Sequence, residues 1–239
     1  FANNVEEEKE AYNKLIFVEK VNKIILHNLK TNDQRIKLLR KNNINFVTWG
    51  RTQDLKNYSW VDLDNQGSIE LIISNLIYKK HKHISYINIA ENYNFAYQRK
   101  QGYLKSLKKF NIKYNNKYYI TVKNEEPEKS ANLIKKMLIN NKKITAIICA
   151  TEYTAVGAIK ACNELNKKIG NDISIVTFDG PVVNRITTPS LSAVAHPRDQ
   201  LGIKAIEMLL SMDENNYKHQ FFLAKPILID RGTIHTVSK

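Results

Sequence analysis

Few residues in this 239-residue sequence have the types and spacing that catalysis requires. There is no GxGxxG, GxxxxGK[ST], GxSxG or HExxH pattern, so the common signatures of nucleotide binding, ester hydrolysis and zinc proteolysis are absent from the sequence. A thiol nucleophile would need Cys149 or Cys162 with a base such as His196, but both cysteines stand in apolar, periodic segments. We therefore predict core cysteines and a protein that is not an enzyme.

A metal site is not expected from the histidines. His81 and His83 are two residues apart and could share the end of a strand, but no third ligand lies near them in the sequence. We interpret this pair as part of a junction between a helix and a strand. The sequence predicts no metal and no cofactor.

The net charge of +14 raises the question of nucleic-acid binding by the chain itself. The positive charge comes mainly from lysines spread along the whole chain, and only seven residues are arginine. Because phosphate and base recognition usually relies on clustered Arg and Lys, we expect a solvated lysine surface. The sequence has no run of 18 apolar residues and no signal-peptide pattern, and its two cysteines lie in apolar segments. These features favour a cytoplasmic protein without a membrane partner.

Strand and helix patterns alternate along the chain and must position any site. Short, β-branched apolar runs at 23–26, 84–89, 146–150 and 173–178 are typical of strands covered on both faces. Between the strands, apolar residues recur at helical spacing in four sets: Ala11, Leu15 and Val18; Ile69, Ile72, Ile73 and Leu76; Ala155, Ile159, Cys162 and Leu165; Leu201, Ala205 and Met208. Asn65 and Thr151 are expected to begin helices as caps. The alternation predicts an α/β fold with parallel sheets and right-handed crossovers.

Several segments carry a recognisable pattern. IGNDISIVTFDG at 169–180 is followed by TPSLSAVAHPRDQLGIKAIEML at 188–209, and this pair is similar to a signature of the lactose and galactose repressor (LacI/GalR) family of transcription regulators. Other segments resemble the same family in order and spacing: FVTWGRT, WVDLDNQG, LIYKKHKHISYI, QRKQGY, TAIICATEYTAVGAIKACNELN and ILIDRGT. Lys80 departs from the family, which has a glycine before the first histidine of its motif.

The resemblance implies two doubly wound parallel-sheet sublobes of the type I periplasmic binding protein kind, with a ligand cleft between them. Three chain crossings are expected, near 62–63, 195–196 and 222–224. The amino-terminal sublobe would comprise 1–62 and 197–223, and the carboxyl-terminal sublobe 63–196 and 224–239. The family's helix-turn-helix and the first strand and helix of its core have no counterpart here, so we expect the amino-terminal sublobe to be incomplete.

Candidate ligand contacts follow from the family motifs, because ligands of open α/β sheets bind beyond the carboxyl ends of the strands. Asp179 could accept hydrogen bonds from sugar hydroxyls or, alternatively, cap the next helix. Arg99 could bind a vicinal diol or an anion, or lie on the helix surface. Trp49 could stack on a sugar ring or belong to the core. The full predicted set is Trp49, Arg51, Tyr93, Phe95, Arg99, Glu125, Thr151, Asp179, His196 and Arg198.

The resemblance implies the sensing core of a transcription regulator. A small-molecule effector, a sugar or sugar derivative, would close the cleft and control operator DNA binding through the helix-turn-helix of a homodimer. A periplasmic sugar-binding protein of a transport system is the alternative, since it shares the two-lobe fold. Tyr93 and Phe95 also leave a purine-type effector open.

Overall fold

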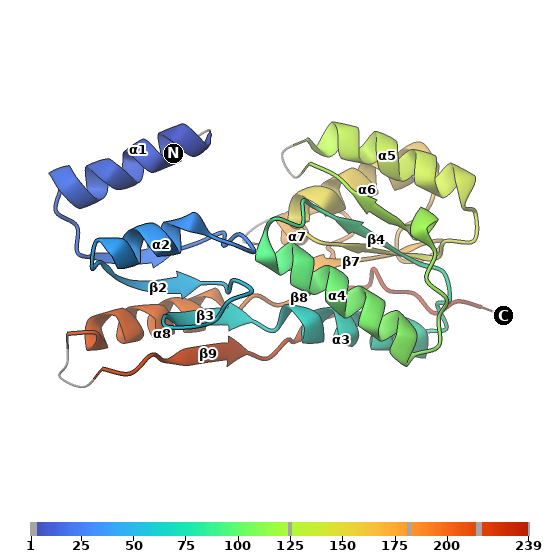
Figure 1. The fold of residues 1–239 in the computed structure, drawn as a ribbon. Helices are drawn as coiled ribbons and strands as arrows, with labels where there is room; N and C mark the ends of the chain where they lie inside the picture. Colours follow the sequence, from blue (N-terminus) through green and yellow to red (C-terminus); the bar gives the residue numbers. More distant parts are fainter. Residues whose placement is uncertain (1–3, 124–125, 181–182, 214–216, 239) are drawn as a thin grey trace. The chain divides into compact units, whose positions relative to one another are not determined.

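The computed structural model describes residues 4–123, 126–180, 183–213 and 217–238 (Figure 1). The chain divides into two compact units. Unit 1 contains Phe1–Asp62 and Arg198–Leu223, and unit 2 contains Leu63–Pro197 and Ala224–Lys239. The division expected from the resemblance places the second crossing one residue earlier.

Unit 1 is built on a four-stranded sheet of order β1-β2-β3-β9. Its strands are β1 (Lys23–Leu26), β2 (Asn45–Trp49), β3 (Ser59–Leu63) and β9 (Phe221–Ala224). β1 pairs in parallel with β2, and β2 with β3. Its helices are α1 (Val5–Asn13), the π-helix η1 (Lys14–Val18), α2 (Gln34–Lys41) and α8 (Arg198–Ser211).

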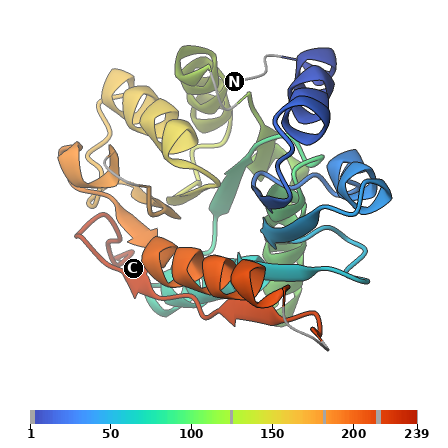
Figure 2. The same cartoon turned by 90° about the vertical axis from the view of Figure 1, so that its left-hand side faces the viewer.

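Helices cover both faces of this sheet (Figure 2). On one face, Leu26 and Phe46 from the strands pack with Ile16 of η1 and Leu39 of α2. On the other face lies α8, whose buried stripe is the predicted one: Leu201, Ala205 and Met208. The alternation of side chains along β1 and β2 therefore supplies two apolar surfaces, as expected for a sheet with a helix layer on each side.

The first helical segment differs from the prediction. α1 ends at Asn13 and the chain continues as a π-helix, in which the Glu19 N–H donates to the Lys14 carbonyl. The wider turn rotates the following residues, so Ile16 is buried whereas Val18 is 70% exposed. The predicted common face of Ala11, Leu15 and Val18 is therefore wrong, because it assumed a regular α-helical period.

Unit 2 is built on a six-stranded sheet of order β10-β8-β7-β6-β4-β5. Its strands are β4 (Ile84–Asn88), β5 (Tyr119–Thr121), β6 (Ala146–Cys149), β7 (Ser174–Phe178), β8 (Ser192–Val194) and β10 (Leu228–Ile229). The pairs from β5 to β8 are parallel, and β10 runs antiparallel to β8. Its helices are α3 (Asn65–Tyr78), α4 (Asn94–Lys109), η2 (Asn116–Tyr118), α5 (Pro127–Asn140), α6 (Glu152–Glu164) and α7 (Val183–Ile186).

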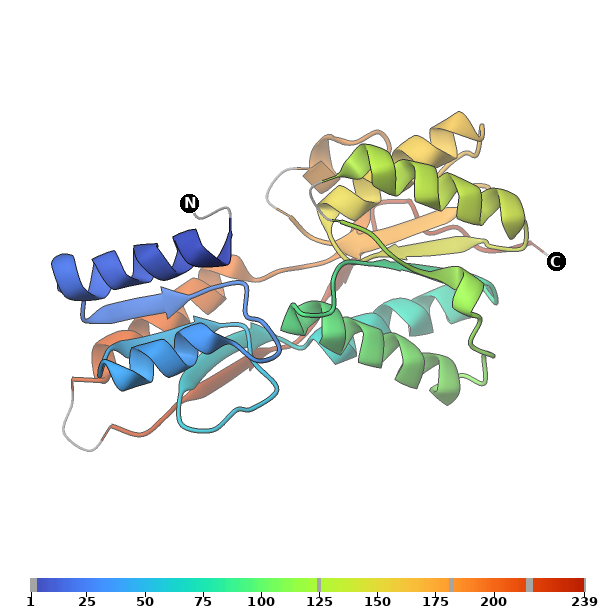
Figure 3. The ribbon, with the colours of Figure 1, turned by 45° about the horizontal axis from the view of Figure 1, so that its top comes forward.

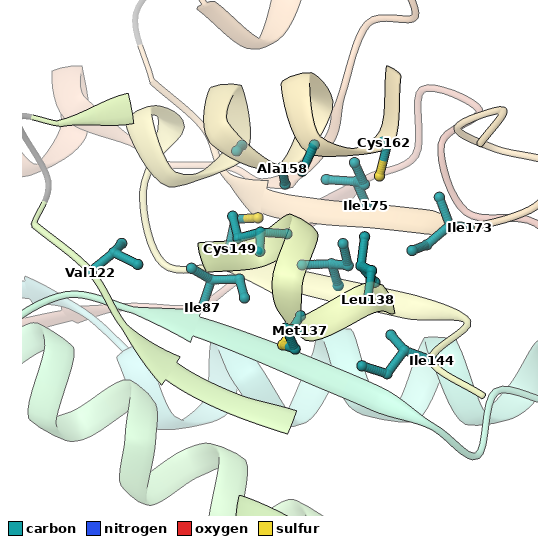
Figure 4. Packing of buried hydrophobic residues seen from close by; sticks show 14 of the residues in the cluster. Ile87, Val122, Met137, Leu138, Ile144, Cys149, Ala158, Cys162, Ile173 and Ile175 are labelled. Atoms are coloured by element: carbon teal, nitrogen blue, oxygen red, sulfur yellow. The ribbon is translucent and has the colours of Figure 1, made fainter. Parts of the chain in front are cut away.

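The sheet of unit 2 lies between two helix pairs, α3 with α4 and α5 with α6 (Figure 3). Figure 4 shows the core on the α5–α6 side, where Met137 and Leu138 of α5 meet Ile87 and Cys149 of the sheet. On the other side, the predicted α3 face is fully buried: Ile69, Ile72, Ile73 and Leu76. The predicted α/β fold with two parallel-sheet lobes is confirmed.

Both cysteines are core residues, as predicted. Cys149 and Cys162 are buried free thiols within the α5–α6 core. Burial raises the pKa of the Cys149 thiol well above its usual range and that of Cys162 to about 12. Neither group is therefore an activated nucleophile.

Of the two predicted helix caps, one is confirmed and one is wrong. Thr151 caps α6 in a reciprocal pair with Thr154. The cap of α3, however, is Asp64, whose Oδ1 accepts from the Gly67 N–H at 2.9 Å. Asn65 lies inside the helix, where its buried side-chain oxygen accepts a hydrogen bond from Arg99 Nε. Among the described helices, none is long and apolar enough to cross a bilayer.

Candidate ligand-binding site

The carboxyl ends of β4, β6 and β7 lie at one edge of the unit 2 sheet, because these neighbouring strands are parallel. After β4 the chain passes through Tyr93 into α4, which carries Phe95 and Arg99. After β6 it reaches Thr151, and after β7 it reaches Asp179. Five of the predicted contacts therefore belong to elements that meet at this edge, which is where open α/β sheets bind ligands.

Arg99 is the most constrained of these side chains. It is 6% exposed, and its Nε donates to Asn65 Oδ1 at 2.9 Å while Nη1 donates to the Ala150 carbonyl. The guanidinium carbon lies 3.3 Å from the ring centroid of Phe178 and 4.8 Å from that of Phe95. Two aromatic rings and two neutral oxygens thus hold the planar cation in a fixed orientation. The surface-helix alternative for Arg99 is wrong, because the residue is buried.

Asp179 is tied to the closing segment of the chain. Its backbone N–H donates to the Val194 carbonyl at 2.7 Å, which anchors the residue at the end of β7. Its carboxylate accepts from Arg231 Nη2 at 3.3 and 3.4 Å and from Asn184 Nδ2 at 3.4 Å. These long contacts orient a buried carboxylate without matching the 2.7–2.9 Å typical of a strong charge-assisted bond.

Thr151 and the adjacent Glu152 occupy the start of α6. Thr151 Oγ1 accepts from the Thr154 N–H at 3.2 Å, and its carbonyl accepts from Thr177 Oγ1 at 3.1 Å. The Glu152 carboxylate lies directly against Gly180, where any Cβ would overlap it. This contact brings a second carboxylate next to the residue that follows Asp179.

Tyr93 and Phe95 flank the start of α4. Both side chains are half-buried, and their ring centroids are 6.0 Å apart in a tilted arrangement. Phe95 also faces the Arg99 guanidinium, so the two rings and the cation form one cluster at the mouth of the helix. Glu125 lies outside the described residues.

Trp49 and Arg51 follow each other at the end of β2 in unit 1. The Trp49 ring lies 5.6 Å from that of His27, and Gly202 of α8 faces the same indole. Arg51 Nε donates to Asp62 Oδ2 at 2.8 Å, and its guanidinium carbon is 5.0 Å from the Trp60 ring. Both predicted residues therefore have defined contacts within their own unit.

His196 and Arg198 flank the boundary of the two units. His196 is half-buried and follows β8, and the exposed Arg198 is the first residue of α8. His196 therefore lies in the segment between β8 and α8, and Arg198 opens α8.

The histidine pair lies at the α3–β4 junction, as interpreted from sequence. His81 is buried and contacts Thr145 Oγ1 at 2.9 Å, the His235 carbonyl at 3.0 Å and Ser174 Oγ at 3.1 Å. Burial lowers its pKa to about 4, although the hydrogen bond to the His235 carbonyl acts in the opposite direction. Within the described part of the chain, no group of three or more His, Cys, Asp or Glu side chains is placed to hold a metal ion.

Sequence reasoning missed three residues of this edge: Asn65, Phe178 and Glu152. Glu152 could have been found from the sequence, because it is a carboxylate shortly after the carboxyl end of β6, as Asp179 is after β7. Phe178 reads as an ordinary core residue at the end of an apolar strand. Asn65 was assigned to a cap, and its role depends on a partner 34 positions away.

Residues 73–234 match the model of the periplasmic binding protein-like domain. The chain belongs to this family. The PurR transcriptional repressor of Histophilus somni (strain 2336) is 29% identical over 163 residues, which cover 68% of this chain and 49% of that protein. A transcriptional regulator LacI from Bacillus cereus subsp. cytotoxis NVH 391-98 superposes with a TM-score of 0.90 at 25% identity, covering 98% of this chain and 84% of that one.

A regulator named CelR, solved with cellobiose, has the same fold: its TM-score is 0.88 at 18% identity, over 96% of this chain and 71% of that one. The chain spans about half the length of the curated relatives it matches. Within the periplasmic binding protein-like family, it corresponds to the effector-binding core of LacI-family regulators. These are non-enzymatic transcription factors, which confirms the prediction that the chain is not an enzyme.

Proposed function

We propose that the chain senses a sugar or sugar derivative and that this binding controls operator recognition by a helix-turn-helix domain of the longer protein. The regulator acts as a homodimer in the cytoplasm. The observation that carries the proposal is the cluster at the carboxyl edge of unit 2, where a fixed guanidinium lies between aromatic rings and two carboxylates follow adjacent strands.

The chemistry of this edge suits a polyhydroxylated ligand. The Asp179 and Glu152 carboxylates can accept hydrogen bonds from neighbouring hydroxyl groups. The Arg99 guanidinium adds a fixed positive charge against the Phe178 ring. The half-buried rings of Tyr93 and Phe95 can cover the C–H face of a sugar. CelR, which shares this fold, was solved with cellobiose, so the fold accommodates a sugar. The transcription-regulator relatives favour a regulatory role over a periplasmic carrier. Trp49, Arg51, Glu125, Thr151, His196 and Arg198 stay predicted contacts.

Sensing requires that the effector prefer one arrangement of the protein over another. An effector that binds both arrangements equally well cannot change operator affinity, however tightly it binds. The buried, protein-bonded state of Arg99 favours such selectivity, because a guanidinium fixed in one orientation accepts a ligand in few geometries.

A thermal-shift screen against mono- and disaccharides, sugar phosphates and purines tests the ligand class. A sugar at a hundredfold excess over its Kd should stabilise the protein by about 2.7 kcal/mol. Asp179→Asn, which keeps the shape of the side chain, should weaken that sugar's binding by about tenfold or more. Glu128→Gln, which alters an exposed carboxylate on α5, should leave it unchanged.

Two outcomes would contradict the proposal. Stabilisation by a purine and by no sugar would assign the site to the other effector class. Sugar binding that is equal in Asp179→Asn and in Glu128→Gln would place the ligand elsewhere. Operator gel shifts with the full-length protein, with and without the sugar identified, test the regulatory step separately.

A further inference from the structure

Two hollows lie at the opposite edge of the unit 2 sheet, where β4 begins. The larger, of about 700 Å³, is lined by His83, Tyr103, Tyr114 and Tyr118 together with Lys82 and Lys113. The smaller, of about 570 Å³, shares both lysines and adds Lys80. Because Ile84 begins β4 and the candidate effector residues follow its other end, this groove is separate from that site by roughly 13 Å of strand.

The aromatic wall of the groove is fixed by its own contacts. Tyr103 is buried and its hydroxyl donates to the Ile84 carbonyl at 2.9 Å. The Tyr118 hydroxyl lies 3.1 Å from His83 Nδ1, and the two rings are nearly perpendicular. Tyr114 stands edge-on to Tyr103, with centroids 6.5 Å apart, and is 43% exposed. A planar ligand therefore meets an accessible ring backed by anchored neighbours.

The charges around the groove are not compensated. Among the described residues that line the two hollows, none is acidic. Lys80, Lys82 and Lys113 are exposed, and no ion pair to any of them occurs across the described ranges.

Three lysines at or near the α3–α4 pair have partners instead. Lys79 pairs with Asp230, Lys105 donates to Gln66, and Lys109 pairs with Glu70. The lysines of the groove thus lack the carboxylate partners that Lys79 and Lys109 have.

We propose that this groove binds a nucleoside monophosphate or a ligand of the same chemistry, a planar aromatic ring carrying a phosphate. The ring stacks on Tyr114, and the phosphate lies between Lys82 and Lys113. The volume suits one such molecule, since small-ligand sites span about 300–1,000 Å³. A single nucleic-acid strand offers the same groups, and an oligonucleotide therefore serves as the competing ligand in the test.

Calorimetry on the purified chain with AMP, adenosine, inorganic phosphate and a dT8 oligonucleotide tests the assignment. AMP should bind more tightly than either adenosine or phosphate. Only AMP has both a ring to stack on Tyr114 and a phosphate to contact Lys82 and Lys113. Lys82→Gln/Lys113→Gln and Tyr114→Ala should each weaken AMP binding by about tenfold. Lys136→Gln/Lys168→Gln removes the same charge from exposed lysines outside the groove and should change it little.

Three results would overturn the proposal. AMP binding no tighter than that of phosphate would indicate charge attraction alone. Equal weakening by both double-lysine variants would indicate a general surface effect, and much tighter binding of dT8 would indicate a nucleic-acid surface. Asp179→Asn should bind AMP as the unmodified chain does; loss in that variant would place AMP at the candidate effector site instead.

Discussion

Units 1 and 2 share one layered plan but differ in how fully their sheets are covered. In unit 2, four adjacent strands, β4, β6, β7 and β8, consist only of buried residues. In unit 1 this holds for β3, whereas the edge strands β1 and β9 expose apolar side chains such as Ile25 and Phe221. The outer face of α8 carries a further exposed stripe, Ile203, Ile206 and Leu210.

This difference indicates where rigidity resides. Ligand contacts must be held within fractions of an ångström, and the carboxyl edge of unit 2 rests on strands packed on both faces. In unit 1 only β3 among the described strands is buried along its whole length, so we expect the stability of this unit to depend more on what covers β1 and α8.

The largest expected difference is between two isoleucines in strands. Ile147→Ala in β6 should lower the free energy of unfolding by about 3–4 kcal/mol, because it opens a cavity in a core with no exposed surface. Ile25→Ala in β1, where the side chain is 39% exposed, should cost about 1 kcal/mol or less. Urea denaturation followed by circular dichroism measures both. Equal losses would show that the two sheets are equally packed.

The second largest expected effect is a pH dependence of the unfolding free energy that arises in unit 2. The pKa of His81 is lowered to about 4 in the folded protein, against about 6.5 when unfolded, so the unfolded chain binds more protons between these values. Stability contributed by neutral His81 is present above pH 6.5 and is lost as the pH falls toward 4. From pH 8 to pH 5 the loss should be about 2 kcal/mol.

His81→Gln removes this titration and should flatten that part of the pH profile of the unfolding free energy. His219→Gln in unit 1 is the matched control, since its histidine is less buried and its pKa is lowered to a smaller extent. Identical profiles for the unmodified chain and His81→Gln would show that His81 does not cause the loss of stability at low pH.

Local sequence patterns predicted most of the fold, for an identifiable reason. The runs at 84–89, 146–150 and 173–178 were recognisable because a strand buried on both faces needs consecutive apolar residues. The run at 23–26 also forms a strand, but β1 is an edge strand with Ile25 exposed, so its predicted burial on both faces is wrong. The buried face of α3 was equally clear, since four isoleucine and leucine side chains recur at helical spacing. The π-helical turn at η1 has no such local signature.

The candidate site was only partly predictable. Strand ends identified Asp179, and the family motif identified Arg99, but the motif did not indicate that Asn65 and Ala150 hold the guanidinium. Those partners come from a different helix and a different strand, so they become neighbours only in the folded chain. The Glu152–Gly180 contact likewise depends on the register of β6 and β7.

Alanine substitutions at two helical glycines, one in each unit, should change the stability in opposite directions. In unit 2, a Cβ on Gly102 of α4 would lie 2.9 Å from the Gln66 carbonyl oxygen and 3.0 Å from the Gln66 Cα of α3. Backbone atoms cannot move aside cheaply, so Gly102→Ala should destabilise unit 2 by about 1–2 kcal/mol despite alanine's better helix propensity. Thermal unfolding of the variant measures the loss, and an unchanged midpoint would show that α3 and α4 are loosely packed.

In unit 1, a Cβ on Gly202 of α8 would lie 3.6 Å from Trp49 Cζ3, an ordinary van der Waals distance. Gly202→Ala should therefore stabilise unit 1 by about 0.5–1 kcal/mol, because alanine loses less backbone entropy on entering a helix. Hydrogen exchange of the α8 and β2 amides should report slower opening in this variant, with unit 2 amides as the internal control. Faster exchange in α8 would mean that the indole of Trp49 needs the space above Gly202, which would make the packing of unit 1 tighter than its exposed strands suggest.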